Sequence, residues 1–253
     1  MLFCGIALSL LFASPLAGGR ASSQTPDGGP GSDSNRWRFE FVPYLWFASL
    51  DGTIGVDPLP TVRIPADLPD PMVNLDFALA DAFRARKGPW VVLSDITFTK
   101  LGVDETVSSS QVEIDSVLVW ASLAAGYAVV DAPGGRVEVF AGARYTLLDN
   151  DGRSTGVITA SSSKVDDWVD PIVGFDARGQ LAERWSVGLL ANIGGFGVGS
   201  DLSYEILPRV SYAWNEIITL HAGYRLLSMD FDSSNLTYDV RESGWIAGVG
   251  FGF

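Results

Sequence analysis

His221 is the only histidine in the 253-residue chain, so it is the first residue to consider for catalysis. As a general base, a histidine needs a nucleophile within hydrogen-bond reach and an acidic group that orients its ring. Within Thr219–Gly223 no serine lies two positions away, where it would share one strand face with His221. Ser203 or Ser211 on a neighbouring strand could approach the ring. We predict a hydrogen-bonded histidine on a polar face and no catalytic residue.

Metal ligation and phosphate binding have little support in the sequence. A transition-metal site needs clustered His, Cys or carboxylate ligands, and the chain has one His and one Cys, Cys4. Asp149–Gly152 is similar to part of a calcium loop, but Val157–Ala160 stand where its bidentate Glu should follow. The glycine-rich run Gly194–Asp201 lacks the Lys and the strand-to-helix context of a phosphate loop, so we expect a hairpin tip or a kink. The sequence therefore predicts no metal and no cofactor.

Charged residues recur at alternate positions inside otherwise apolar segments. Basic and acidic side chains on this polar face are nearly equal in number, and Gly, Ser and Thr lie between them. Because Arg forms bidentate pairs with carboxylates, these groups could pair with one another in a narrow space. The predicted network consists of Arg38, Glu40, Asp95, Glu138, Arg144, Asp170, Asp176, Arg178, Glu205, Arg209, His221 and Arg225.

Strands with two unlike faces are the elements that can bring these residues together. From Arg36 onward apolar and polar residues alternate with a period of two, which is typical of such strands. Short turns with Gly or Pro alternate with longer acidic connections, a hairpin pattern. We predict about ten strands, with eight or twelve as alternatives. Their expected ranges are 36–48, 74–86, 89–101, 111–130, 136–149, 167–181, 185–196, 200–214, 217–231 and 238–253.

The connections between these strands also carry expectations. Residues 74–86 could form a helix instead of a strand. The segment Pro58–Pro71 contains five prolines, which should preclude regular strand pairing. Longer loops are expected at 51–72, 103–110, 150–165 and 232–237.

The composition narrows the class of protein. The chain is 47% hydrophobic and 19% charged, its formal net charge is −13, and its mean hydropathy is +0.21. It is too apolar for a disordered chain and too acidic to follow nucleic acid. After the first dozen or so residues, no run of about 20 apolar residues could span a bilayer as a helix. Apolar residues placed on alternate strand positions explain high hydropathy without long apolar runs.

The amino terminus has the features of a secretory signal. The apolar stretch Leu2–Ala13 has the length of a signal h-region and is followed by small residues up to Ala21. We therefore expect a signal peptide at 1–21 and a disordered linker rich in Pro, Gly and Ser at 22–35. The barrel should then occupy 36–253.

Aromatic residues lie at or near the ends of the predicted strands. They are Trp37, Trp90, Trp185, Tyr212, Trp214 and Trp245. In membrane barrels such residues form girdles at the two headgroup levels, while apolar residues face lipid and polar residues face the lumen. In hydrocarbon, only helices and closed barrels pair every backbone polar group. The sequence thus predicts an all-β, antiparallel, up-and-down transmembrane β-barrel.

The final segment, SGWIAGVGFGF, ends in Phe and places alternate apolar residues on one face. These residues are Trp245, Ala247, Val249, Phe251 and Phe253. The segment resembles the terminal assembly signal of bacterial outer-membrane barrels. Four further segments look like those of an uncharacterised group of small Gram-negative barrels of OmpA/OmpW-like architecture. They are PYLW from Pro43, WVDPIVG from Trp168, GGFGVGSD from Gly194 and GYR from Gly223.

This resemblance implies a place in the bacterial outer membrane. It also implies outer-membrane lipid, lipopolysaccharide and the barrel assembly machinery as partners, with no nucleic acid and an oligomeric state left open. Five arginines with six carboxylates, in a barrel little wider than one of eight strands, favour mutual pairing. We therefore expect a largely plugged polar lumen with a structural or surface-interaction role and no enzymatic activity. The alternatives are a narrow porin-like channel for small solutes, a lipid-modifying hydrolase, and a secreted soluble barrel.

Overall fold

The computed structural model describes residues 36–253 except 58, 60, 65–74, 108, 158, 234 and 235. The predicted signal peptide and linker therefore lie outside the described residues. The strands are β1 (Arg38–Val56), β2 (Val62–Ile64), β3 (Leu75–Lys87), β4 (Trp90–Val107), β5 (Ser110–Ala132), β6 (Gly135–Gly156), β7 (Ala160–Ala182), β8 (Trp185–Gly195), β9 (Leu202–Ala213), β10 (Ile218–Asp232) and β11 (Leu236–Gly252). In this part of the chain, no helix is long and apolar enough to cross a membrane.

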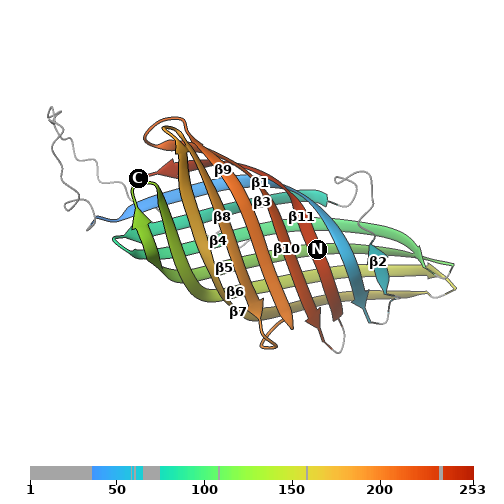
Figure 1. The fold of residues 1–253 in the computed structure, drawn as a ribbon. Helices are drawn as coiled ribbons and strands as arrows, with labels where there is room; N and C mark the ends of the chain where they lie inside the picture. Colours follow the sequence, from blue (N-terminus) through green and yellow to red (C-terminus); the bar gives the residue numbers. More distant parts are fainter. Residues whose placement is uncertain are drawn as a thin grey trace, which may run out of the picture. The chain divides into compact units, whose positions relative to one another are not determined.

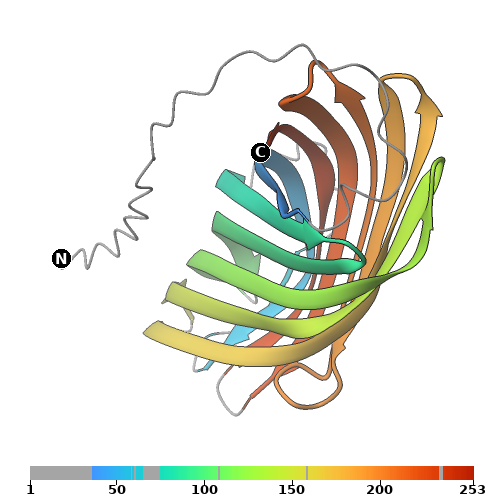
Figure 2. The same cartoon turned by 90° about the vertical axis from the view of Figure 1, so that its left-hand side faces the viewer.

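Ten of these strands close into an antiparallel barrel, which confirms the predicted fold class (Figures 1 and 2). β1 and β3 to β11 pair in chain order, and β11 pairs back onto β1, from Glu40 opposite Gly252 to Val56 opposite Leu236. Closure removes the free sheet edges that would otherwise expose unpaired backbone groups. Residues 75–87 form a strand, so the helix alternative is wrong.

β2 lies outside the closed barrel. β2 belongs to the proline-rich segment Pro58–Pro71, where the sequence predicts no regular pairing. It nevertheless pairs with Gly52–Ile54 of β1. The three residues Val62–Ile64 lie between prolines and keep their own N–H groups, so a ladder of this length can still form.

The two ends of the barrel are distinguished here by which connections lie at each. At one end, which we call the turn end, β3–β4, β5–β6, β7–β8 and β9–β10 are joined by two or four residues. β1 begins and β11 finishes at the same end, where the backbone N–H of Phe39 donates to the carbonyl oxygen of Phe253 at 2.8 Å. We call the opposite end the loop end.

β4 to β7 are longer than predicted. Pairing continues to Val107 opposite Ser110, and to Ser154 opposite Ala160, so the loops predicted at 103–110 and 150–165 are wrong. Figure 1 shows β5 to β7 running well past the ends of β9 to β11. The acidic and serine-rich composition of these segments indicates loops. However, strands that continue beyond the apolar exterior face water on their outer side and need no apolar residues there.

Alternation along each strand divides the barrel wall into two faces. Outward residues such as Leu45 (45% exposed) and Leu123 (62%) alternate with inward ones such as Trp46 (2%) and Trp120 (1%). A continuous apolar exterior of this extent is unfavourable in water and is typical of a lipid-facing surface.

The predicted interface aromatics fall near the two limits of this apolar exterior. Trp37, Trp90, Trp185, Tyr212 and Trp214 lie near the turn end. Trp245 lies toward the loop end, and its ring packs edge-on against Tyr224 at a centroid distance of 5.3 Å. Phe253 is exposed on the outer side and stacks on Phe39 at 5.5 Å.

The inner face changes character along the barrel. Most charged residues lie toward the turn end, whereas a buried apolar and aromatic core, which also contains the carboxylate of Glu242, lies toward the loop end. This core includes Trp46, Leu118, Trp120, Leu148, Trp168, Leu227, Met229, Tyr238 and Val240. The lumen is therefore less polar than predicted, because some inward positions also carry large apolar side chains.

Gly244 permits a close approach between β11 and β1. A Cβ atom at this inward position would lie 1.9 Å from the carbonyl oxygen of Phe47, a distance at which the two strands would have to move apart. Gly250 is similarly close to a side chain, because a Cβ there would lie 2.6 Å from Nε2 of His221. These glycines allow the β1–β11 seam and its neighbouring inner side chains to pack as they do.

Candidate functional site in the barrel interior

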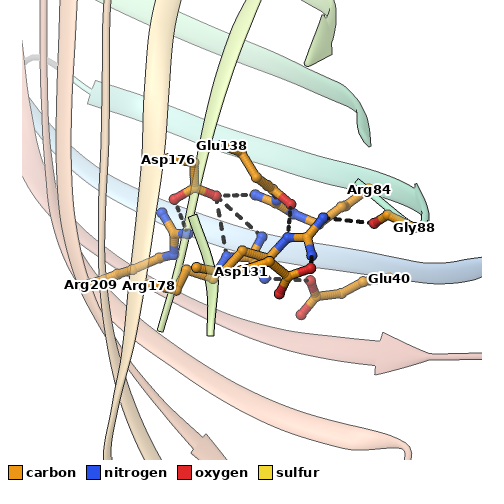
Figure 3. A network of polar contacts seen from close by, with 9 residues as sticks. Glu40, Arg84, Gly88, Asp131, Glu138, Asp176, Arg178 and Arg209 are labelled. Carbon is orange, nitrogen blue, oxygen red and sulfur yellow. Dashed lines mark hydrogen bonds and ion pairs between the residues drawn. The ribbon is translucent and has the colours of Figure 1, made fainter. Parts of the chain in front are cut away.

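The charged inner residues near the turn end form one connected network, which we call the turn-end cluster (Figure 3). It consists of Glu40 on β1, Arg84 on β3, Arg136 and Glu138 on β6, Asp176 and Arg178 on β7, and Arg209 on β9. Each member occupies an alternate, inward strand position. Antiparallel pairing of β6 with β7 then sets Glu138 directly beside Asp176.

Asp176 is the centre of the turn-end cluster. One of its oxygens accepts a hydrogen bond from Nη2 of Arg209 at 2.6 Å, and the other accepts from Nη2 of Arg178 at 3.2 Å and from Arg84. The Asp176 side chain is 0% exposed. A buried carboxylate is tolerated only when such charged donors replace its water shell. The three guanidinium groups therefore tie β3, β7 and β9 together through one buried anion.

Glu138 links this network to the turns. It accepts hydrogen bonds from Arg84 and from Nε of Arg136 at 2.6 Å. Arg136 also donates to the carboxylate of Asp131 at 2.5 Å and to the carbonyl oxygen of Gly88 at 2.9 Å. The cluster is thus anchored to the β3–β4 turn and to the end of β5 (Figure 3).

A second network, the central cluster, crosses the barrel nearer the loop end. Glu205 accepts from Nη2 of Arg144 at 2.9 Å, and its other oxygen lies 2.8 Å from Nη2 of Arg225. Asn192 donates to Glu205 at 2.8 Å, and Arg225 donates to Asp95 at 2.9 Å. Both guanidinium groups are at most 2% exposed, whereas the Asp95 side chain keeps 25% of its surface exposed.

Aromatic rings cover the central cluster. The guanidinium carbon of Arg225 lies 4.8 Å from the ring centroid of Trp120 and 5.2 Å from that of Trp46. The two indole rings stack at 5.9 Å. Tyr44 donates to Asp95 at 2.7 Å and accepts from Arg225. Cation–π contacts and hydrogen bonds of this kind hold the side chains in place across the interior.

A cavity of about 320 Å³ lies on the turn-end side of the central cluster. Its wall reaches from Asp95 and Glu205 in the central cluster to Arg184 in the β7–β8 turn. Arg178 and Arg209 of the turn-end cluster also line it. The interior therefore combines a cavity on one side with a filled region on the other.

His221 lies in the wall of this cavity between a hydroxyl and a carboxylate. Its Nδ1 is 2.9 Å from Oγ of Ser211, the residue opposite it on β9. Its Nε2 is 3.6 Å from Oε1 of Glu40. Of the two serines that could approach His221, the structure places Ser211 there, whereas Ser203 is paired with Met229 and Gly194 farther along the strands.

Two residues of the predicted network lie elsewhere. Arg38 is exposed at the start of β1. Asp170 is buried, but it accepts hydrogen bonds from the backbone N–H and the hydroxyl of Ser200, both at 2.7 Å. Asp170 thereby fixes the glycine-rich β8–β9 connection, in which Gly195, Phe196 and Gly197 have positive φ angles. His221 lies in the cavity wall, and the remaining predicted charges fall in the two clusters.

Several interior residues are not predicted from the sequence. Arg84 lies in the segment that could be a helix, and Arg136 lies in a short polar turn, so neither is assigned to the inner face. Extending the alternation through β3 would have found Arg84. The alternation places Tyr44 on the same face as Glu40, but Tyr44 and Asn192 carry no charge and are therefore not assigned to the network. Asp149–Gly152, which is similar to part of a calcium loop, lies within β6.

Comparison with protein-family models and with curated protein sequences gives no match. Among solved structures, the outer membrane protease OmpT from Escherichia coli has a TM-score of 0.50 at 8% identity and covers 88% of this chain and 98% of its own. The translocator domain of the autotransporter NalP from Neisseria meningitidis has a TM-score of 0.45 at 11% identity, covering 85% and 88%. Ail, the attachment invasion locus protein of Yersinia pestis, has a TM-score of 0.36 at 14% identity, covering 87% and 99%.

The similarity to OmpT shows that this chain has the fold of a bacterial outer-membrane β-barrel. The closed sheet, the apolar exterior and the inward charges are the features that such a fold needs to span a bilayer.

Proposed function

We propose that this protein is an outer-membrane barrel with a closed lumen, and that its role is structural or surface-interacting. The observation that supports this proposal is the filled interior at the central cluster. Trp46, Trp120, Arg144, Arg225 and Tyr238 project inward from five strands and are each at most 2% exposed. A water-filled channel at this level would leave them accessible to solvent.

The energetics of the central cluster also favour a closed state. To open the lumen, Arg225 would have to leave Asp95, Glu205 and the two indole rings. Separating one partner from a buried ion pair costs about 3–5 kcal/mol when the other stays buried. An open conformation that breaks two such pairs would therefore be rare at equilibrium.

The surface role rests on the extended strands β4 to β7. They continue past the apolar exterior and carry exposed polar side chains such as Glu113, Asp115 and Asp151. We propose outer-membrane lipid and lipopolysaccharide as the surroundings of this region. The terminal strand, with Phe251 and Phe253 outward, would be the part that the barrel assembly machinery recognises.

Solute uptake by proteoliposomes tests the closed lumen. Wild-type protein should admit small sugars no faster than empty vesicles. A Glu205→Ala/Arg225→Ala variant, which removes one cation and one anion and so keeps the net charge of the interior, should admit them faster. A Trp37→Ala/Trp90→Ala variant, altered only on the exterior, serves as the matched control. Uptake by wild-type vesicles well above the empty-vesicle rate would contradict the proposal.

A hydrolase is the second candidate, because Ser211, His221 and Glu40 lie side by side in the cavity wall. His221 could accept the proton of the Ser211 hydroxyl as that oxygen attacks an acyl carbon, and Glu40 would stabilise the resulting imidazolium. The Glu40 contact of 3.6 Å is longer than a hydrogen bond, so the acid would have to move closer during the reaction.

Ester hydrolysis by the refolded barrel tests this second candidate. If Ser211 is the nucleophile, turnover of a small ester should disappear in both Ser211→Ala and His221→Ala. Ser186 lines the same cavity on β8, so Ser186→Ala should retain turnover. Equal turnover in wild type and Ser211→Ala would remove this candidate.

A further inference from the structure

Asp81 interrupts the apolar pattern of the barrel exterior. On β3 it follows Ala80, which is 3% exposed and points inward, and it lies two residues after Leu79, which is 48% exposed and points outward. Alternation therefore directs Asp81 outward. It lies opposite Pro43 on β1 and opposite Ile96 on β4, and Ile96 is 40% exposed. An acidic side chain thus lies among lipid-facing residues.

The register places Asp81 near the middle of the apolar exterior. The outward row of β1 consists of Phe39, Phe41, Pro43, Leu45 and Phe47, and Asp81 is paired with the third of these five. On β4, Ile96 is four residues from Lys100, the next ionisable residue of its row. About 13 Å of strand separates the two positions at about 3.3 Å per residue. Asp81 is therefore far from the polar ends of the wall.

Other strands carry apolar side chains at this depth. The outward row of β8 consists of Val187, Leu189, Ala191 and Ile193, and that of β11 consists of Trp245, Ala247, Val249 and Phe251. Among the side chains that the structure describes, Asp81 is the one ionisable group within these apolar rows, and it has no hydrogen bond or ion pair with another described residue. An ionisable group that faces hydrocarbon is unfavourable and commonly marks a functional contact.

We propose that the face formed by β1, β3 and β4 around Asp81 is the contact between two copies of this chain in the membrane. Ser94 is the residue that indicates a second copy as the partner. It lies in the outward row of β4, two residues from Ile96 and diagonally next to Asp81. A serine hydroxyl donates and a carboxylate accepts, so this one face carries both halves of a hydrogen bond.

A two-fold contact would form the hydrogen bond between Ser94 and Asp81 twice, once in each direction. In such an isologous interface the same surface of each copy meets its equivalent. Asp81 would accept from Ser94 of the partner subunit, and Ser94 would donate to the partner's Asp81. The apolar side chains beside them, Leu79 and Phe98, would pack around the two hydrogen bonds and exclude lipid. A different protein would need a donor of its own at this depth.

Site-specific oxidation tests which face is in contact. A Leu79→Cys variant in native outer membranes should form a covalent dimer on mild oxidation, because Leu79 lies beside Asp81. Ile193→Cys, on β8, serves as the matched control and should stay monomeric. The wild-type chain, whose one cysteine is Cys4, shows how much covalent dimer forms without an introduced cysteine. Equal dimer yields at both positions, no dimer at Leu79→Cys, or cross-linking to a protein of another mass would each overturn the proposal.

The dimer dissociation constant tests the hydrogen bonds themselves. In lipid vesicles, Asp81→Ala and Ser94→Ala should each raise it about tenfold or more, and the double variant should add little to either. Ile193→Ala should leave it unchanged. Heat-modifiable gel migration verifies that each variant is folded. A wild-type chain that stays monomeric at every protein-to-lipid ratio, or an unchanged constant in both single variants, would refute the proposal.

Discussion

Replacing Asp176 with Asn is expected to destabilise the barrel by about 3–5 kcal/mol. Asp176 is 0% exposed and accepts from Arg84, Arg178 and Arg209, so the substitution removes the charge that compensates three guanidinium groups. An amide keeps the shape and one acceptor oxygen, but it places an NH2 group where at least one Arg now donates. Water cannot replace the lost charge without opening the cluster, which is why the expected cost is large.

Asp131 provides the matched control for this prediction. It pairs with Arg136 at 2.5 Å, but its side chain is 60% exposed, so Asp131→Asn should cost at most about 1 kcal/mol. Urea unfolding of the refolded proteins in lipid vesicles, followed by tryptophan fluorescence, gives both free energies of unfolding. Adding Arg209→Gln to Asp176→Asn should recover part of the loss, because one uncompensated cation is removed. If Asp176→Asn and Asp131→Asn differ by less than about 1 kcal/mol, the cluster does not stabilise the fold as described.

Three further changes have specific expected outcomes. Gly244→Ala should reduce the folded fraction seen by heat-modifiable gel migration, because its Cβ would lie 1.9 Å from the Phe47 carbonyl oxygen, whereas Gly134→Ala, with open space around it, should fold normally. Ser200→Ala should cost about 1.5–3 kcal/mol in urea unfolding and speed proteolysis of the β8–β9 connection, because it removes a hydrogen bond to buried Asp170; unchanged proteolysis would argue against that anchor. Trp168→Ala should cost about 3–5 kcal/mol, since Trp168 is 6% exposed and stacks on Phe231 at 3.9 Å; a loss below about 1 kcal/mol would mean that the loop-end core is loosely packed.

The sequence predicts the barrel well because its signal is periodic and local. The period of two assigns Glu138, Arg144 and Asp176 to the inner face without any knowledge of their partners. The count of ten strands follows from the spacing of turns. The ends of β6 and β7 could not be located in this way, because a strand that leaves the apolar exterior has the composition of a loop.

The pairing inside the lumen could not be predicted from the same signal. Asp170 is the direct cross-strand neighbour of Arg144, yet it accepts from Ser200 of a folded-back connection instead. Arg144 reaches across the barrel to Glu205. Which charges meet depends on strand tilt and on the three-dimensional path of the β8–β9 connection, neither of which appears in residue spacing.

Asp81 shows the complementary case, in which an exception to the period is informative. The alternation assigns an acidic residue to the lipid-facing side of β3, but only the register with Pro43 and Ile96 places it at mid-depth. A residue that departs from the alternation in the sequence thus indicates a candidate interface once its neighbours in the sheet are known.

The closed lumen is the central claim, and planar-bilayer recording of the wild-type protein tests it most directly. Because Trp46, Trp120, Arg144 and Arg225 fill the interior, insertion of the folded barrel should add no discrete conductance steps to the baseline. Stable, reproducible single-channel steps from wild-type protein, at a size independent of the preparation, would contradict the account.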